Sequence, residues 1–177
     1  HQMTHEPEGM VLIDQRPKEI EDRVIPGHWE GDLILGQKCQ SALGTLVERK
    51  TRFLMLVPLK SKRAEDVRES FARKVKYLPE QLRRTLTYDQ GAEMTNHHRL
   101  FTQDTQMKVY FAHLKSPWER GTNENTNGLI RQFFPKGTNF NSVSTEEIER
   151  VEYLINDRPR KVLDWMKPCE AFAEVLR

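Results

Sequence analysis

Three acidic residues, Asp32, Asp89 and Glu124, stand in local contexts that suit metal-dependent chemistry. Asp32 lies in a predicted strand directly after Gly31, and Asp89 lies at the end of a short predicted strand, two residues before Gly91. Glu124 falls in the first turn of a predicted helix. Carboxylates from separate elements are suitable ligands for Mg²⁺, and two such ions about 4 Å apart can activate an attacking oxygen and stabilise a leaving one. The three acids therefore predict phosphodiester chemistry.

Each acid also has an ordinary structural interpretation. Asp89, in the string Tyr-Asp-Gln-Gly, is typical of a turn residue. Glu124 suits the positive end of any amphipathic helix. Asp32 is harder to explain in this way, because an acid beside an apolar run is costly to bury without a partner or a metal ion. Glu30 and Glu93 lie close by in the sequence, and we expect both at the surface, with auxiliary metal binding as the alternative.

The elements that must position these acids are a mixture of strands and helices. Strands are predicted at 28–35, 42–47, 53–59, 85–88 and 108–112, and helices at 61–78, 96–105, 122–134 and 144–156, followed by a loop and a short helix. Ser61 and Ser144 are the predicted N-caps of two of these helices. Residues 1–25 are predicted to be a tail or linker, and residues 26–177 a single domain. The mixed order predicts a sheet with helices on its faces.

The helix predicted at 122–134 separates into two faces at about 100° per residue. Glu124, Asn127, Gly128 and Arg131 share the polar face, and the apolar residues opposite can pack on the sheet. The polar face offers an acid, an amide and a cation, which all suit contact with a phosphate backbone. An ordinary amphipathic helix is the alternative.

Composition and charge limit the possible classes of function. The chain has 177 residues, of which 31% are charged and 37% hydrophobic, with a net charge of +2. No apolar run approaches the roughly 20 residues of a membrane span, so we expect a soluble domain without a membrane partner. Residues 60–84 are rich in bases, which suits DNA but also a solvated helix face. Cys39 and Cys169 match no zinc spacing and are predicted to be free thiols in a reducing cytoplasm.

Several strings resemble the catalytic domain of bacterial insertion-sequence transposases of the family numbered thirty. They are 27–32 (GHWEGD), 45–52 (TLVERKTR), 86–91 (LTYDQG), 116–121 (SPWERG), 123–129 (NENTNGL), 134–138 (FPKGT) and 156–161 (NDRPRK). The similarity runs from about Arg16 to Ala173. It implies an α/β fold of the ribonuclease-H-like, retroviral-integrase type, in which helices flank a mixed sheet.

The resemblance also implies an activity and a catalytic site. It implies a DDE triad at Asp32, Asp89 and Glu124 that would hold two Mg²⁺ or Mn²⁺ ions. The implied reaction is cleavage of double-stranded DNA at transposon ends, followed by strand transfer into target DNA. Because two ends must be joined in one event, a homodimer or larger oligomer is expected. In this family a helix-turn-helix region precedes the catalytic domain, and because the first residue is not Met we expect a piece of a longer protein.

Six residues near the triad are candidates for contact with DNA: Lys115, Trp118, Arg120, Asn127, Arg131 and Lys136. The cations could clamp phosphates, the tryptophan could stack on an unpaired base, and the asparagine could bind the backbone. Surface cations and a tryptophan that wedges its loop against the domain are the alternatives. Two rival functions stay open: a nuclease of the same fold that cleaves without joining, and a non-catalytic DNA-binding or assembly domain.

Overall fold

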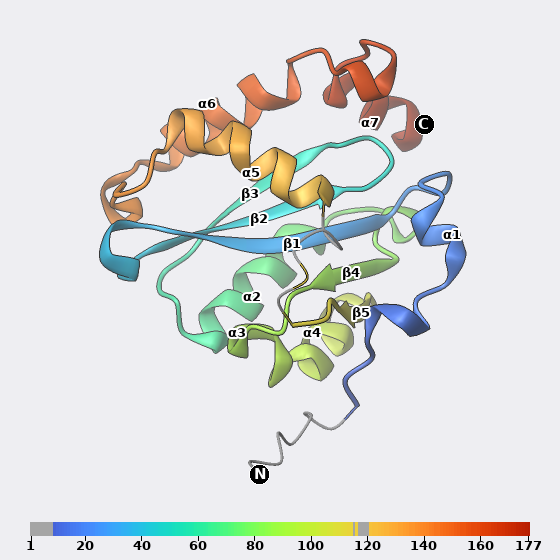
Figure 1. Cartoon of the computed structure of the whole chain (residues 1–177), viewed down its shortest axis with the longest axis horizontal. Coiled ribbons are helices and arrows are strands. Elements are labelled where there is room, and N and C mark those ends of the chain that lie inside the picture. The colour runs from blue at the N-terminus through green and yellow to red at the C-terminus, as the bar shows by residue number, and fades with distance from the viewer. Residues whose placement is uncertain (1–8, 115, 117–120) are drawn as a thin grey trace.

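A mixed β-sheet forms the centre of the molecule (Figure 1). The computed structural model describes residues 9–114, 116 and 121–177. Within them the strand order is β3-β2-β1-β4-β5. The strands are β1 (His28–Leu35), β2 (Ala42–Glu48), β3 (Leu54–Pro58), β4 (Thr85–Tyr88) and β5 (Lys108–Phe111). The first three are antiparallel neighbours, whereas β4 pairs in parallel with both β1 and β5, so the predicted mixed sheet is confirmed.

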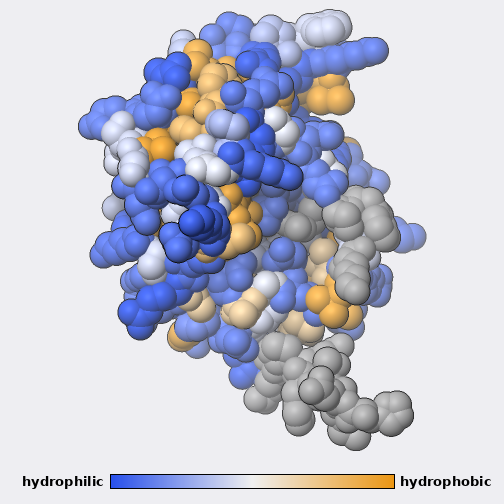
Figure 2. Space-filling model, turned by 60° about the vertical axis from the view of Figure 1, so that its left-hand side comes forward, coloured by the Kyte–Doolittle hydropathy of each residue, from blue (hydrophilic) through white to orange (hydrophobic). Residues whose placement is uncertain are grey.

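Helices cover both faces of the sheet (Figure 1). One face carries α5 (Gly121–Phe133) and α6 (Thr145–Asn156), and the other carries α2 (Ala64–Val75), α3 (Ala92–Thr95) and α4 (His98–Thr105). At one end of the sheet, Phe172 of α7 (Pro168–Leu176) stacks on Phe53 with ring centroids 4.1 Å apart. None of the helices that the structure describes has the length and apolar character needed to cross a bilayer. The surface in Figure 2 is mostly hydrophilic, with apolar residues in small groups.

Two helices were predicted to begin at serine N-caps, and the structure shows which residues occupy those N-cap positions. Ser144 is the N-cap of α6, and its hydroxyl accepts a hydrogen bond from the Glu147 amide at 3.1 Å, which confirms that prediction. The predicted cap at Ser61 is wrong, because Arg63 takes the N-cap position of α2. The Ser61 hydroxyl instead donates to Asp66 Oδ2 at 2.6 Å, so it closes the preceding loop onto the helix.

Alternation along the strands decides which side chains enter each core. Gly31 and Gly44 face α2, and a Cβ atom on Gly31 would lie only 2.9 Å from the Tyr88 ring. A Cβ atom on Gly44 would lie 2.8 Å from the Phe71 ring. These glycines therefore make room for Tyr88 and Phe71, which meet edge to face with centroids 6.0 Å apart. Gly31 thus serves core packing on the side of the sheet opposite the Asp32 side chain.

The opposite core lies between the sheet and the helices α5 and α6. Its buried side chains include Ile34, Leu56, Ile130, Phe134 and Val151. Asn156, at the end of α6, seals the outer strand β3: its Oδ1 accepts from the Leu54 amide and its Nδ2 donates to the Leu54 carbonyl, both at 2.9 Å. This pair satisfies backbone groups that an edge strand would otherwise present to another chain.

We expect Asn156→Ala to lower the free energy of unfolding by about 2–3 kcal/mol, because it removes two buried hydrogen bonds and leaves the Leu54 amide and carbonyl without this partner. Urea unfolding followed by circular dichroism measures the change. Asn141→Ala, at an exposed position, is the matched control and should change little. Equal effects of the two substitutions would contradict a sealing role for Asn156.

The segment predicted as a tail packs on the domain over its described part. Ile20, in the short helix α1 (Lys18–Glu21), is 1% exposed. Arg16 is also buried and donates from Nη1 to Thr87 Oγ1 at 3.0 Å. Leu12 forms a parallel bridge to Phe111 of β5. Sequence periodicity does not reveal this docking, because single residues make it rather than a regular element.

Candidate active site

Asp32 and Asp89 lie on the same side of the sheet and line one pocket. β1 and β4 run in parallel with Glu30 opposite Thr87. Side chains two residues apart on a strand share a face, so Asp32 and Asp89 both follow this pair on the face that α5 covers. Both are half-buried and line a cavity of about 400 Å³. The structure thus brings two of the three predicted acids to one pocket, and their role in catalysis stays a prediction.

Hydrogen bonds fix the orientation of both carboxylates. Asp32 Oδ1 accepts from the Leu33 amide at 2.9 Å, and Asp32 Oδ2 accepts from Asn127 Nδ2 of α5 at 3.0 Å. Asp89 Oδ1 accepts from the Gly91 amide at 2.9 Å. Asp89 is thus a turn residue and a pocket residue at once, because the turn that it closes holds its carboxylate at the end of β4.

Glu124 stands apart from the two aspartates. It is exposed on α5 and is not among the residues that line their pocket. It lies three positions before Asn127, so the two share a helix face, and Asn127 contacts Asp32. Across the described ranges 9–114, 116 and 121–177, no three His, Cys, Asp or Glu side chains lie close enough to hold a metal ion. The structure therefore pairs Asp32 with Asp89 and places Glu124 one helical turn from the residue that binds Asp32.

The donor set suits a hard cation. Mg²⁺ prefers oxygen ligands, and it is usually held by one or two carboxylates together with water and substrate phosphates. Asp32 and Asp89 supply two carboxylates in one pocket, and Glu124 in the first turn of α5 is the candidate for a third.

Glu93 also belongs to this pocket. It is half-buried, lines the cavity with the aspartates, and accepts a hydrogen bond from the Tyr88 hydroxyl at 3.1 Å. The expectation that Glu93 lies on the open surface is wrong, because α3 begins directly after the Asp89 turn and carries it back over the pocket. Burial raises the pKa of Tyr88 well above its usual value, and the negative charges of Glu93, Asp89 and Asp32 raise it further. The phenol therefore stays neutral and acts as a donor.

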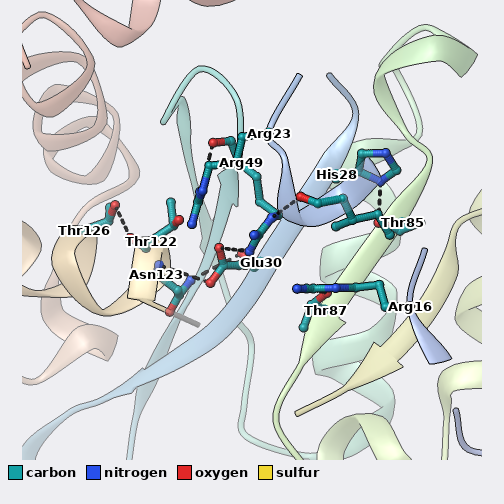
Figure 3. Close-up of polar contacts among 11 residues, drawn as sticks. Arg16, Arg23, His28, Glu30, Arg49, Thr85, Thr87, Thr122, Asn123 and Thr126 are labelled. Carbon is teal, nitrogen blue, oxygen red and sulfur yellow. Dashed lines mark hydrogen bonds and ion pairs between the residues drawn. The ribbon is translucent and has the colours of Figure 1, made fainter. Parts of the chain in front are cut away.

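Glu30 is the second acid whose predicted surface position is wrong. It is 0% exposed, and its Oε2 pairs with Arg49 Nη1 at 2.8 Å (Figure 3). Its Oε1 accepts from the Asn123 amide of α5 at 3.4 Å. Alternation places Glu30 on the same covered face as Asp32, where a carboxylate requires a charged partner. Arg49 is the cation that pairs with Glu30, but no local pattern in the sequence indicates that these two residues meet.

Asn123 is a further residue of the site that sequence reasoning did not assign. It is 0% exposed, and its Nδ2 donates to the Glu30 carbonyl and to Thr45 Oγ1, both at 3.3 Å. Its Oδ1 accepts from Asn127 Nδ2 at 3.2 Å. The two asparagines, one turn apart, therefore fasten α5 to β1 and β2. The spacing of these asparagines could have indicated such contacts, because two amide side chains on the face of a helix that packs on a sheet need hydrogen-bond partners there.

The six candidates for DNA contact divide into two groups. Lys115, Trp118 and Arg120 lie outside the described residues. Asn127 binds Asp32, and Lys136 is exposed. Arg131 donates from Nη2 to the Leu35 carbonyl at 2.9 Å, and burial lowers its pKa. DNA contact at these positions stays a prediction.

Comparisons with known proteins agree with this geometry. Residues 25–117 match the family model described as integrase core domain. The chain is 49% identical over 167 residues to the transposase for insertion sequence element IS1086 of Cupriavidus metallidurans, which covers 94% of this chain and 49% of the relative. It is 46% identical over 158 residues to transposase InsI for insertion sequence element IS30A of Escherichia coli, covering 89% of this chain and 41% of the relative. The chain thus spans about half the length of these relatives, or less.

A solved structure supports the fold. It is the complex of the simian T-cell lymphotropic virus intasome with the PP2A regulatory subunit B56 gamma. The match has a TM-score of 0.58 at 17% identity and covers 75% of this chain and 49% of the other. Together with the order and directions of the strands, it confirms the predicted ribonuclease-H-like fold of the integrase type.

Proposed function

The chain belongs to the integrase core domain family, and on that premise we propose that it is the catalytic domain of a DNA transposase. It would cleave DNA at transposon ends and join the freed 3′ strand to target DNA. The relatives that match it at 49% and 46% identity are both transposases of insertion sequences. The observation that carries the proposal is the pairing of Asp32 and Asp89 in one pocket, beside a helix whose polar face contacts Asp32.

The proposed chemistry depends on divalent metal ions. Asp32, Asp89 and Glu124 would hold two Mg²⁺ or Mn²⁺ ions, which would activate the attacking oxygen and stabilise the leaving oxygen. Glu124 is exposed, so its side chain has room to turn towards the aspartates when DNA binds. The carboxylates themselves serve as ligands, so no covalent bond between protein and DNA is required.

The other residues of the site orient these carboxylates. Asn127 directs one oxygen of Asp32, and the Gly91 amide directs Asp89. The Asn123 contacts hold α5 at a fixed height over β1, which determines where Glu124 can reach. Prior orientation of ligands lowers the reorganisation that the reaction would otherwise require.

We further propose double-stranded DNA as the partner and an assembly of at least two copies, because two transposon ends must be joined together. The solved structure that shares this fold is described as an intasome. The bacterial origin of the transposase relatives suits action on DNA in the cytoplasm.

A strand-joining assay tests this function against its rivals. The substrates are a double-stranded oligonucleotide with the element's end sequence, already cleaved to expose its 3′-hydroxyl, and a plasmid target with Mg²⁺ or Mn²⁺. We expect covalently joined product, and none from an end that lacks the 3′-hydroxyl. Nicked plasmid without joined product would indicate a nuclease, and DNA binding without either product would indicate a binding domain.

A further inference from the structure

The loop between α6 and α7 projects an exposed tryptophan. Trp165 is 67% exposed, and Val162 on the same loop is 68% exposed. The loop spans residues 157–167 and lies at the top of the view in Figure 1, on the side of the sheet that α5 and α6 cover. The string 156–161, which carries part of the family resemblance, leads into it. The proposed chemistry gives this surface no role.

Backbone hydrogen bonds hold the loop in one conformation. The Trp165 amide donates to the Arg160 carbonyl at 2.8 Å, and the Asp164 amide donates to the Lys161 carbonyl at 3.1 Å. These two bonds form the arrangement that closes many helix ends, with a left-handed residue inside it. The Arg160 amide in turn donates to the Met166 carbonyl at 3.1 Å and closes the loop. The tryptophan is therefore held in a fixed position at the surface.

The same conformation strains the backbone. Asp164 has a φ of 52° and Trp165 a φ of 67°, so two successive residues other than glycine adopt the left-handed region. That region is unfavourable for them because the Cβ atom crowds the following carbonyl oxygen. Burial of the indole would compensate for the strain, but the indole is largely exposed. Packing within the domain therefore does not explain the placement of Trp165, and strained residues of this kind are concentrated at functional sites.

The loop that carries the tryptophan is basic. Within residues 158–166 the charged side chains are three cations and one acid, namely Arg158, Arg160, Lys161 and Asp164. The acid just before them, Asp157, is paired with Lys167 at 3.0 Å. Arg158 is fixed on the end of α5, where its Nη1 donates to Gln132 Oε1 at 3.3 Å. The indole thus projects from an element whose cations outnumber its acids.

Arg160 lacks an acceptor for two of its donors. Its side chain is half-buried, and among the residues that the structure describes none accepts a hydrogen bond from its Nε or Nη2. Burial lowers the pKa of Arg160, and the charges of Arg158 and Arg52 lower it further. Buried donors without acceptors are unfavourable, and a guanidinium is well matched to the oxygens of a phosphate. An anion beside the loop would reduce both the repulsion and the unmet hydrogen-bonding capacity.

We propose that this loop binds an unpaired strand of DNA, with the Trp165 indole stacked on a base and Lys161 at a backbone phosphate. Proteins that hold single strands combine stacked aromatic side chains with cations along the backbone. Bases inside a duplex are stacked on one another, so an indole can reach the face of a base only where the strand is unpaired. The inference rests on the proposed function, which takes DNA as the ligand and frees a 3′ strand at the transposon end.

A second copy of the chain is the alternative occupant, because tryptophan and arginine are also common in protein interfaces. The core of such an interface is depleted of charged residues, whereas this loop has three cations close to the indole in the sequence. The two donors of Arg160 without acceptors likewise favour an anionic ligand. The charges therefore favour a phosphate backbone over another copy of the chain.

DNA binding in the absence of divalent metal tests the proposal. The probes are a labelled duplex with a single-stranded 3′ extension of about six nucleotides, within the usual range of single-strand sites, and the same duplex with blunt ends. Trp165→Ala should weaken binding to the extended duplex by roughly 5- to 100-fold, the range expected for loss of one stacked base. Binding to the blunt duplex should change little. Trp165→Phe keeps an aromatic face and should retain most of the affinity.

Lys161→Gln tests the phosphate contact separately. Lys161 is exposed, so its replacement leaves the core untouched. Loss of one phosphate contact on the single-stranded extension should lower the slope of log K against log salt by about 0.7. This variant also decides the question if Trp165→Ala does not fold.

The end of α2 supplies matched controls. Tyr77 is an aromatic residue that is 82% exposed, and Lys76 Nζ lies 5.9 Å from the centroid of its ring. Tyr77→Ala and Lys76→Gln therefore remove an exposed aromatic and an adjacent cation from the other face of the sheet, and should leave both affinity and slope unchanged. The urea midpoint of Trp165→Ala should stay within about 0.3 M of the wild type, because the lost side chain is largely exposed.

Three results would overturn the inference. Trp165→Ala and Lys161→Gln could bind the extended duplex like the wild type, or the controls could weaken binding equally. Sedimentation could instead show that Trp165→Ala separates copies of the chain without changing DNA affinity, which would make the loop an interface between copies. A wild-type chain that binds the extended duplex through Trp165 but never joins strands would defeat the proposed function and leave this inference standing.

Discussion

Asp32→Asn and Asp89→Asn should each reduce strand joining by about a thousandfold or more and leave the fold intact. Both side chains line the same pocket, and each substitution removes a negative charge that a divalent cation requires. A loss of roughly 4 kcal/mol in transition-state stabilisation corresponds to this factor. The amide has the shape of the carboxylate and still accepts a hydrogen bond, so the contacts with Leu33 and Gly91 can persist.

Two measurements check this result. The joining assay gives the activity, and calorimetric titration with Mn²⁺ gives metal binding by the same variants. Asp104→Asn is the matched control, because Asp104 is an exposed acid on α4 that pairs with Arg68 at 2.8 Å, on the other face of the sheet. It should change neither quantity. Wild-type joining by either aspartate variant would remove that residue from the proposed site.

Glu124→Gln tests whether the site uses three carboxylates or two, because the structure places Glu124 outside the pocket of the two aspartates. If Glu124 turns into the site with DNA and metal, this variant should lose joining to the same extent as Asp32→Asn. An active Glu124→Gln variant would leave a two-carboxylate site and make Glu93, which already lines the pocket, the next residue to test.

Local patterns predicted the elements of this fold well, and contacts between distant residues poorly. The bounds of β1 and β4 agree with the predicted strands, and α6 begins after its predicted cap. Such features depend on neighbouring residues, so the sequence displays them directly. The docking of Ile20 and Arg16 cannot be predicted from neighbouring residues, because each contributes one side chain to a contact surface that exists only in the folded sheet.

The candidate site shows the same division. Parallel pairing of β1 and β4 brings Asp32 and Asp89 to one pocket, whereas the predicted order of strands and helices did not specify which strands are neighbours. The burial of Glu30 was missed, because its partner Arg49 lies 19 residues away across a strand and its contact with Asn123 spans 93 residues. A carboxylate in a strand can be solvated or paired, and its own neighbours in the sequence do not distinguish the two.

Arg49→Met should lower the free energy of unfolding by about 3–5 kcal/mol, since it leaves the carboxylate of Glu30 buried without its cation. The arginine and the glutamate are 5% and 0% exposed, so water cannot readily replace the lost partner. The substitution also removes the bond from Arg49 Nε to the Ile20 carbonyl at 3.1 Å, which holds the N-terminal segment. Urea unfolding of the variant and the wild type measures the difference.

The double variant Glu30→Gln with Arg49→Met separates the buried charge from the lost packing. A neutral amide at position 30 no longer needs a cation, so the double variant should recover a large part of the stability that Arg49→Met loses. Arg150→Met, which breaks an exposed pair with Glu147, should leave unfolding almost unchanged. If Arg49→Met were as mild as Arg150→Met, the buried pair would not hold α5 to the sheet. Asn123 and Asn127 would then have to position the helix that carries Glu124 on their own.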